Sequence, residues 1–252
     1  MLKNSIKTGD LFALGQHRLL YGDATSPESV SKLIDDKKIN LLLTDPPYGV
    51  AVVESKRSFG GSHRPIENDH IQSDEEYRTF SQKWLAAVKP HLFPKNSFYI
   101  FNSDRLVFAL KDALDQENFK LSQLLVWLKT GAVIGRLNYL PQHELIAYGW
   151  FGRHEFIRSQ DKSVLICPKT QRNNLHPTMK PVPLLRRLIL NSSKRNDIIL
   201  DPFGGSGSTL IACEQLQRSC FMIEIDPNYC QTIMDRFEKT TGKKINFIRN
   251  VS

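Results

Sequence analysis

Two hydrophobic periods alternate along the chain and divide it into strands and helices. Short apolar runs bounded by glycine, proline or aspartate predict buried strands, whereas apolar residues spaced three and four apart predict helices. The predicted strands span residues 17–21, 39–43, 98–101, 121–128, 143–150, 197–201, 219–224 and 244–248. The predicted helices span residues 27–36, 74–88, 105–114, 183–191, 209–217 and 227–239. Because strands and helices alternate, we expect one α/β domain over residues 1–252 with a mostly parallel sheet.

Polar residues at the ends of these segments predict several boundaries. Ser26 and Ser73 are expected to cap helices, the first because a proline follows it and the second because a glutamate lies three residues on. Asp104 is expected to cap the next helix. The strands at 121–128 and 143–150 follow each other without a helix, which predicts an antiparallel hairpin at the sheet edge.

A stiff corner follows the predicted strand at 39–43. Residues 44–49 read Thr-Asp-Pro-Pro-Tyr-Gly. Two successive prolines lack N–H groups and fix φ, so the chain leaves the sheet rigidly. The corner places Asp45 at the strand tip, offers the carbonyl oxygen of Pro46 as an acceptor, and exposes the ring of Tyr48. Acceptors beside a ring suit a flat ligand that bears an amino group, although a simple capped turn is the alternative.

A glycine-rich turn follows the predicted strand at 197–201. Asp201 ends that strand, and residues 202–209 read Pro-Phe-Gly-Gly-Ser-Gly-Ser-Thr before a helix begins. Glycines let a backbone approach a ligand where a Cβ would collide, and the helix directs its N–H groups and positive dipole end to the same place. Glu224 ends the next strand, where a carboxylate can accept hydrogen bonds from ribose hydroxyls. The arrangement is half of a nucleoside-binding α/β unit.

Three ligands compete for this turn. A P-loop requires a lysine after the glycines, and none follows here; a dinucleotide motif requires a third glycine, where this chain has Leu210. Asp201 also opposes a pyrophosphate, because it adds negative charge beside phosphate. S-adenosylmethionine carries an ammonium group and a sulfonium but no phosphate, so it fits best of the three.

The positive net charge of the chain favours a polyanionic partner. The formal net charge is +8, which favours but does not prove nucleic-acid binding. Residues 49–73 and 151–175 lack a clear period and are read as loops; the first can close over a ligand or be a floppy insertion. The basic residues expected to contact DNA, unless these are only solvated surface loops, are Lys56, Arg57, Arg64, Arg153, Arg158, Lys162 and Arg172.

Other features place the chain inside a cell. No apolar stretch approaches the roughly 20 residues of a membrane span, and the N-terminal residues lack the apolar region of a secretory signal. The four cysteines, Cys167, Cys213, Cys220 and Cys230, form no Cys-x-x-Cys pair. We therefore expect buried free thiols rather than a disulfide framework, and no metal site.

The two motifs together resemble those of the amino-group DNA methyltransferases that use S-adenosylmethionine. These motifs are residues 45–48, Asp-Pro-Pro-Tyr, and residues 201–207, Asp-Pro-Phe-Gly-Gly-Ser-Gly. Their order is similar to that of the circularly permuted beta class. Residues 176–181, His-Pro-Thr-Met-Lys-Pro, and residues 21–23, Tyr-Gly-Asp, are similar to two further motifs of that class. The ordered set covers residues 17–239.

This resemblance implies a fold and a set of site residues. The implied fold is a Rossmann-like, seven-stranded, largely parallel sheet with helices on both faces, and a short target-recognition region at 151–175. The implied catalytic residues are Asp45, Pro46 and Tyr48. The implied cofactor-binding residues are Asp23, Thr178, Lys180, Asp201, Phe203, Gly204, Gly205, Ser206, Gly207 and Glu224. Among them, Asp201 would bind the methionine amine, Asp23 the adenine amine, and Lys180 with Thr178 the carboxylate.

The resemblance also implies a reaction. A base inside a duplex hides its amine, so it must be flipped out of the helix. Tyr48 would stack on the flipped base, while the carboxylate of Asp45 and the carbonyl of Pro46 accept the amine hydrogens. An Asp before Pro-Pro-Tyr is similar to the adenine-N6 enzymes, whereas Ser there marks most cytosine-N4 enzymes. Cytosine-N4 methylation, an RNA amino methyltransferase and a non-catalytic nucleic-acid binder stay open as alternatives, and a nicotinamide dehydrogenase is disfavoured.

The expected partners follow from this family. They are double-stranded DNA with a short specific sequence and a cognate restriction endonuclease, and a homodimer is left open. We expect a cytoplasmic protein of a bacterium or phage, without membrane contact.

Overall fold

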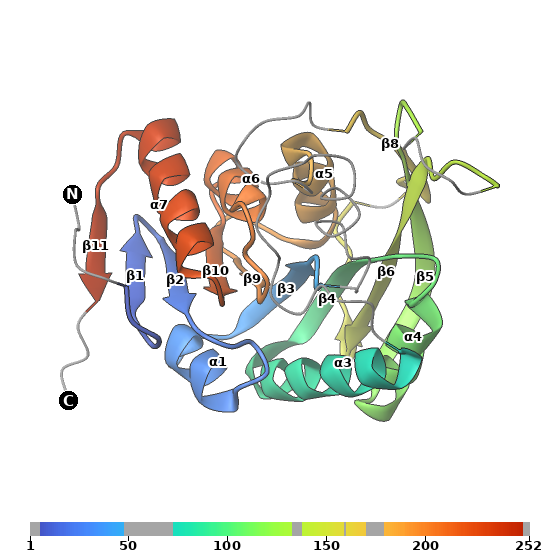
Figure 1. The fold of residues 1–252 in the computed structure, drawn as a ribbon, viewed down its shortest axis with the longest axis horizontal. Coiled ribbons are helices and arrows are strands. Elements are labelled where there is room, and N and C mark those ends of the chain that lie inside the picture. Colours follow the sequence, from blue (N-terminus) through green and yellow to red (C-terminus); the bar gives the residue numbers. More distant parts are fainter. Residues whose placement is uncertain (1–5, 48–72, 133–137, 159, 170–178, 249–252) are drawn as a thin grey trace.

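The computed structural model describes residues 6–47, 73–132, 138–158, 160–169 and 179–248 (Figure 1). The helices are α1 (Pro27–Ile34), α3 (Asp74–Val88), the 3-10 helix η1 (Lys89–His91), α4 (Val107–Gln116), α5 (Val182–Ser192), α6 (Ser208–Leu216) and α7 (Pro227–Thr241). The strands are β1 (Leu11–Leu14), β2 (His17–Tyr21), β3 (Ile39–Thr44), β4 (Leu92–Asn102), β5 (Phe119–Leu128), β6 (His143–Phe151), β7 (Arg153–His154), β8 (Val164–Ile166), β9 (Ile198–Asp201), β10 (Ser219–Glu224) and β11 (Ile245–Ile248).

One large sheet forms the centre of the molecule. Its strand order is β11-β1-β2-β10-β9-β3-β4-β6-β5-β8, and β7 pairs with β4. The strands from β2 to β4 in this order pair in parallel, whereas β6 is antiparallel to both β4 and β5. The predicted α/β fold, the largely parallel sheet and the β5–β6 hairpin are thereby confirmed.

Among the described residues the sheet has eleven strands, one of them the two-residue β7 beside β4, whereas the resemblance implies seven. The strands from β2 to β5 in the sheet order account for seven. Strands β1 and β11 extend one edge, and β8 extends the other beyond the hairpin, so the hairpin does not form the edge itself. These added strands have only three or four residues each, too few to show a period in the sequence.

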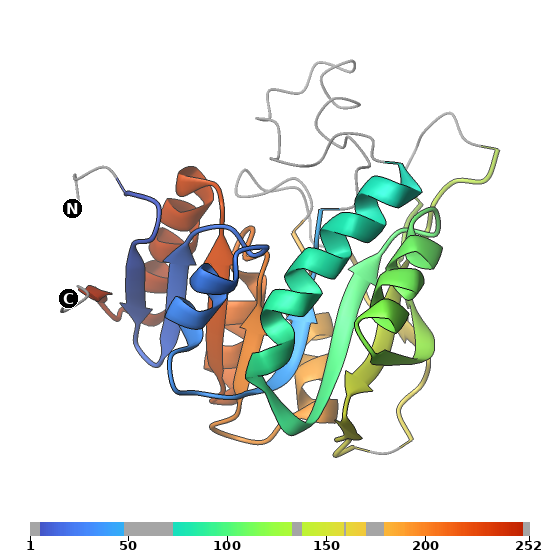
Figure 2. The ribbon, with the colours of Figure 1, turned by 90° about the horizontal axis from the view of Figure 1, so that it is seen from below.

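Helices cover both faces of the sheet, as expected. Helices α1, α3 and α4 lie on one face, and α5, α6 and α7 lie on the other (Figures 1 and 2). Each face has its own apolar core, because alternate strand residues point to opposite sides. Leu41 and Leu43 of β3 pack with residues of α5, α6 and α7, whereas Leu42 packs with α1, α3 and α4.

Most predicted boundaries agree with the structure, with two corrections. The Ser26 hydroxyl accepts from the N–H of Ser29, and Ser73 forms a capping box with Glu76. Asp104 does not cap α4: the N-cap residue is Leu106, which has no side-chain cap, and Asp104 accepts from the N–H of Arg105. Residues 151–175 are not irregular throughout, since they contain β7 and β8.

The carboxyl ends of four parallel strands meet at one edge of the sheet. Tyr21 at the end of β2 pairs with Glu224 at the end of β10, and Asp201 at the end of β9 pairs with Met222. Strand β3 lies beside β9 and ends at Thr44. In doubly wound sheets, ligands bind outside the carboxyl ends of the strands, so this edge positions the predicted motifs together.

Candidate active site

Asp45 lies directly after β3, where the sheet ends. Its side chain is 26% exposed, and its Oδ2 lies 2.5 Å from the Nζ of Lys180. Pro46 is buried and Pro47 half-buried. The predicted stiff corner is therefore present up to Pro47, and its acidic side chain holds an ion pair.

Asp201 joins the two predicted motifs through a hydrogen bond. The Thr44 hydroxyl, one residue before Asp45, donates to Oδ1 of Asp201 at 2.8 Å, and the N–H of Phe203 donates to the same oxygen at 3.3 Å. Burial raises the pKa of Asp201 to about 7, although hydrogen bonds from Thr209 and Thr44 favour its ionised form. The charge of Asp45 raises this pKa further. The two motifs thus form one connected site.

The glycine-rich turn packs closely against the protein around it. Gly205 and Gly207 have φ values of 52° and 74°, in the left-handed region that favours glycine. A Cβ on Gly204 would lie 3.2 Å from Ile233 and 3.3 Å from the carbonyl oxygen of Ile223. Helix α6 begins after Gly207 without a side-chain cap. The N–H groups of Gly204, Gly205 and Gly207 donate to Ile223, Glu224 and Gly204, so internal hydrogen bonds fix the shape of the turn.

Arg236 of α7 and two aromatic residues of α3 contact this turn. The guanidinium of Arg236 donates to the carbonyl of Ser206 at 2.7 Å. Phe203 lies 5.7 Å from the ring centroids of both Phe80 and Trp84 of α3. Neither contact is readable from the sequence, because the partners lie on distant helices.

Glu224 lies at the end of β10 and is buried. Its Oε2 accepts from the N–H of Gly205 at 2.7 Å, and its Oε1 accepts from the N–H of Asp226 at 2.9 Å. Burial raises the pKa of Glu224 to about 7 despite these backbone hydrogen bonds. Its carboxylate therefore already contacts the glycine-rich turn.

Asp23 lies beside Glu224 in space. The N–H of the preceding residue, Gly22, donates to the carbonyl of Glu224 at 3.0 Å. The Asp23 carboxylate is exposed and accepts from both the N–H and the hydroxyl of Thr25 at 2.8 Å. The structure thus brings Asp23, Asp45, Asp201 and Glu224 to one edge of the sheet.

Lys180 lies at this edge beside two charged residues, Glu144 and Lys129, that the sequence analysis did not identify. Its Nζ lies 3.2 Å from Oε2 of Glu144, in addition to its contact with Asp45. Lys129 Nζ lies 2.8 Å from the other oxygen of Glu144. One signal in the sequence points to Glu144: it is a carboxylate within an apolar strand, and buried charges are generally paired.

Several predicted site residues lie outside the described residues. These are Tyr48, Lys56, Arg57, Arg64, Arg172 and Thr178, together with loop residues 49–72. Their predicted roles stay predictions.

Two of the predicted DNA-contacting arginines lie far from Asp45. Arg153 pairs with Lys95, whereas Thr44 pairs with Ile100, five residues further along β4. Five strand residues correspond to roughly 16 Å. Arg158 donates its N–H to the carbonyl of Asn191, at the end of α5 that is opposite to Lys180. The structure does not bring these two side chains to the site.

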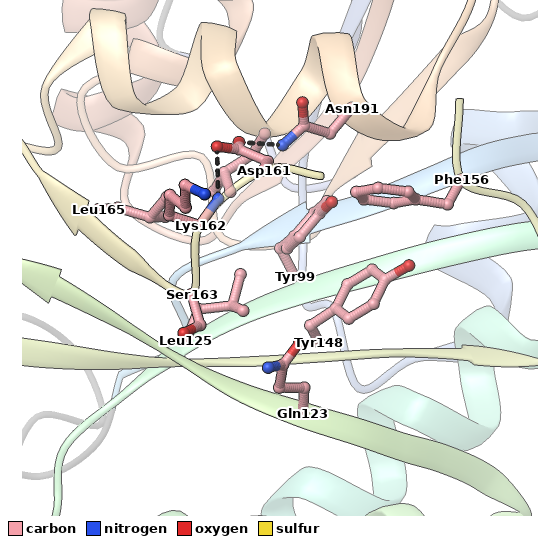
Figure 3. A pocket seen from close by; sticks show the side chains of 11 residues that line it. Tyr99, Gln123, Leu125, Tyr148, Phe156, Asp161, Lys162, Ser163, Leu165 and Asn191 are labelled. Atoms are coloured by element: carbon pink, nitrogen blue, oxygen red, sulfur yellow. Dashed lines mark hydrogen bonds between the residues drawn. The ribbon is translucent and has the colours of Figure 1, made fainter. Parts of the chain in front are cut away.

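A cavity of about 300 Å³ lies between α5 and strands β4, β5 and β6 (Figure 3). Tyr99, Tyr148 and Phe156 line it, together with Asp161, whose pKa is lowered by hydrogen bonds from Arg187. Of the predicted site residues that the structure describes, only Lys162 lines this cavity. The cavity is therefore separate from the Asp45 edge.

Two other predictions concern groups outside the site. All four cysteines are free and buried, as expected. Within the described part of the chain, no set of three histidine, cysteine, aspartate or glutamate residues is placed to hold a metal ion. The helices that the structure describes include none that could span a membrane.

Several solved structures share this fold. M1.HpyAVI in complex with S-adenosylmethionine has a TM-score of 0.66 and 23% sequence identity, covering 86% of this chain and 97% of its own. The PvuII DNA methyltransferase, described as cytosine-N4-specific, has a TM-score of 0.68 and 17% identity, covering 87% and 85%. These likenesses confirm the Rossmann-like methyltransferase fold.

Characterised proteins and a family model match the sequence. The type II methyltransferase M2.LlaDCHI of Lactococcus lactis subsp. cremoris is 27% identical over 228 residues, covering 82% of this chain and 84% of the relative. M2.DpnII of Streptococcus pneumoniae is 28% identical over 224 residues, covering 80% and 83%. The N6/N4 methyltransferase model, described as DNA methylase, matches residues 39–235 and thus spans Asp45, Asp201 and Glu224. The chain therefore belongs to the N6/N4 DNA methylase family.

Proposed function

We propose that this protein transfers a methyl group from S-adenosylmethionine to the exocyclic N6 amine of adenine at a short specific sequence in double-stranded DNA. One observation carries the proposal: the Thr44 hydroxyl links Asp201, at the nucleoside-type turn, to the strand end that bears Asp45. Family membership supports the reaction class. The proposal joins these into one site where an amine and a methyl donor meet.

The residues at the glycine-rich turn fit S-adenosylmethionine. Asp201 is a buried acid that no lysine or arginine among the described residues pairs with, so the ammonium of a ligand would compensate its charge. Glu224 offers carboxylate oxygens to ribose hydroxyls beside the same turn. Two proteins of similar fold, M1.HpyAVI and TTHA0409 of Thermus thermophilus, have been solved with this cofactor. When bound, the cofactor supplies an electrophilic methyl group.

Asp45 and Pro46 would activate the amine. The amine nitrogen of adenine is a poor nucleophile because its lone pair is delocalised into the ring. When the Asp45 carboxylate and the Pro46 carbonyl accept hydrogen bonds from the two N–H groups of the amine, the lone pair becomes localised on the nitrogen. Holding the reacting groups in this geometry supplies much of the rate.

The target base must leave the duplex to reach this corner. Flipping a base costs a few kcal/mol, which contacts in the pocket must offset. We propose that Tyr48 stacks on the flipped base, a contact worth roughly 1–3 kcal/mol in other base–aromatic stacks. Basic residues of the chain would bind the phosphates beside it.

Cytosine-N4 methylation is the second candidate. The Asp before Pro-Pro-Tyr favours adenine by family resemblance, but the PvuII enzyme, which shares the fold, is described as cytosine-N4-specific. Both bases carry an exocyclic amine that the same acceptors could bind. The methylated nucleoside distinguishes the two candidates.

A transfer assay tests the substrate class. The protein is incubated with S-adenosylmethionine that carries a labelled methyl group and with either duplex DNA from bacteria that lack modification or ribosomal RNA. We expect label in duplex DNA at positions that share one short sequence, and none in RNA. Label in RNA alone, or in neither substrate, would contradict the proposal.

The relatives also support a biological setting. Both M2.LlaDCHI and M2.DpnII are named type II methyltransferases, so we propose that this protein acts in the bacterial cytoplasm beside a restriction endonuclease of matching specificity. DNA from cells that express it should resist an endonuclease that cuts the mapped sequence. Cleavage equal to that of unmodified DNA would contradict this pairing.

A further inference from the structure

Four charged residues form a continuous chain of ion pairs across the Asp45 edge of the sheet. We name them the edge ion chain: Asp45, Lys180, Glu144 and Lys129. Lys180 lies between the carboxylates of Asp45 and Glu144, at 2.5 and 3.2 Å, and Lys129 contacts the far oxygen of Glu144 at 2.8 Å. Asp45 follows β3, Glu144 belongs to β6 and Lys129 follows β5. The edge ion chain therefore connects the ends of three strands at the edge where methyl transfer is proposed.

In the edge ion chain both lysines are buried and Glu144 is half-buried. The side chains of Lys180 and Lys129 are 7% and 6% exposed, and that of Glu144 is 19% exposed. Burial alone would raise the pKa of Glu144, but the charges of Lys180 and Lys129 outweigh burial and lower it. Buried charges persist only where such partners compensate them. Glu144 is thus ionised and binds both ammonium groups.

Lys180 is held from three sides. Besides the two carboxylates, its ammonium lies 5.0 Å from the ring centroid of Phe101 on β4, a cation–π contact. A lysine side chain has a flexible four-carbon stem, so these contacts decide where its charge lies. Without Glu144, one of the two anions that fix the ammonium would be lost.

The charged groups around Asp45 indicate what the Lys180 ammonium does. Among the described residues, Lys180 pairs with Asp45, and Asp201 and Tyr77 are close enough to sense its charge: burial raises the pKa of each, and the charge of Asp45 contributes to the rise. Two acids close together favour protonation of one of them. A cation beside Asp45 opposes that protonation, and a protonated carboxyl would be a poorer hydrogen-bond acceptor.

We propose that Lys180 and Glu144 are positioning residues for methyl transfer, with Glu144 holding the Lys180 ammonium against Asp45 so that the Asp45 carboxylate stays ionised and oriented toward the target amine. The inference rests on the proposed role of Asp45 as the acceptor. It assigns Lys180 a task different from the binding of the cofactor carboxylate that the family resemblance implies. It also assigns a role to Glu144, which lies in none of the recognised motifs.

Three variants test the proposal in the full-length protein. K180M removes the ammonium but keeps an apolar stem, E144Q removes the charge of Glu144 but keeps its shape, and K180R restores a cation. K89M is the matched control, because Lys89 pairs with Glu117 at 2.7 Å and lies 6.0 Å from the ring of Phe151, away from the site. Single-turnover methylation of unmodified bacterial DNA is measured at saturating S-adenosylmethionine, together with the cofactor Kd.

The expected results separate a positioning role from cofactor binding. We expect K180M to lower the methylation rate by about 100-fold and E144Q by about tenfold, since small displacements of reacting groups have effects of this size. The cofactor Kd should change less than about threefold, and K180R should recover part of the rate. The double variant should lose about as much as K180M alone, because both residues act through Asp45. K89M should match the wild type.

The pH–rate profile adds a readout that a purely structural role would not change. In K180M the Asp45 carboxylate lacks its cation, so we expect activity on the acidic side to be lost at a higher pH than in the wild type. E144Q should shift the profile in the same direction by less, and it keeps the test valid if K180M folds poorly.

Two outcomes would overturn the inference. One is a K180M variant with a weakened cofactor Kd and a wild-type rate at saturation, which would assign Lys180 to the cofactor. The other is a wild-type rate and pH profile in a folded E144Q. Failure of the proposed function looks different: D45A would then methylate DNA as fast as the wild type, whatever the Lys180 variants do.

Discussion

The acids at the two halves of the site differ in their electrostatic partners. Asp45 is partly exposed and pairs with the ammonium of Lys180. Asp201 and Glu224 are buried and accept hydrogen bonds from hydroxyl and backbone N–H groups, and burial raises the pKa of each to about 7. The charge of Asp45 is compensated within the protein, whereas that of the other two would be compensated by a cationic ligand. One half thus suits a neutral amine and the other a cationic cofactor.

The largest expected effect is on the half that holds Asp45. D45A removes the acceptor, and we expect the methylation rate to fall by about 10²- to 10³-fold, the range of losses seen when a charge-stabilising group is removed from an active site. The cofactor Kd should stay near the wild-type value, because Asp201 and Glu224 are untouched.

The matched control for D45A is D115A. Asp115 is also an acid paired with a cation, Lys111, but it lies on the exposed face of α4. D115A should methylate at the wild-type rate. If D45A kept more than a tenth of the activity, the acceptor role would be wrong.

A smaller effect is expected at the ribose position. E224A removes a carboxylate that can accept from hydroxyls, and hydrogen bonds to charged groups are worth about 1.5–3 kcal/mol. The cofactor Kd, measured by calorimetry, should therefore weaken about 10- to 100-fold. E214A is a control, since Glu214 is a half-buried acid of α6 that pairs with Lys243 and His17 rather than with the glycine-rich turn. An unchanged Kd in E224A would remove Glu224 from the cofactor site.

Cofactor affinity should also depend on pH. Both Asp201 and Glu224 have a pKa raised to about 7 by burial, and an ammonium ligand favours the ionised form of Asp201. Below pH 7 a proton must leave before the cation binds, so the Kd should weaken by up to about tenfold per pH unit for each coupled group. Titration between pH 6 and 8 measures this slope. D201N should flatten it, and an equally steep slope in D201N would contradict the assignment.

The smallest expected effect is on the stability of the ligand-free protein. The pKa of Asp201 is raised from 3.8 to about 7, so the folded state binds more protons than the unfolded state between about pH 4 and 7. The contribution of this group to the free energy of unfolding therefore decreases as pH rises through that window. Between pH 5.5 and pH 8, the free energy of unfolding of the wild type should decrease by roughly 1–2 kcal/mol relative to that of D201N. An identical difference in both proteins, measured by urea unfolding, would show that burial does not perturb this acid.

Local patterns were sufficient to predict the elements that form the site. Strand β3 is a continuous apolar run that ends at a proline-rich corner, and Ser73 with Glu76 marks the start of α3. Asp45 and Asp201 could be placed together because the carboxyl ends of parallel strands share one edge. The structure confirms that they do, through Thr44.

Contacts between distant segments could not be predicted in the same way. The ion pairs of Glu144 join residues that lie 15 positions before it and 36 after it (144 − 129 and 180 − 144), and no local period encodes such spacing. Strand β8 has three residues and pairs with β5, so the chain after Arg158 returns along the sheet edge. A charge count over 151–175 could not show that Arg153 and Arg158 lie at the opposite end from Asp45.

The identity of the methylated nucleoside tests the central claim most directly. Duplex DNA is methylated by the wild-type protein, digested to nucleosides and analysed by mass spectrometry against N6-methyladenine and N4-methylcytosine standards. The account predicts methyl groups on the N6 amine of adenine, with none in a parallel reaction with D45A. Methyl groups on cytosine N4 alone, or equal product from D45A, would contradict it.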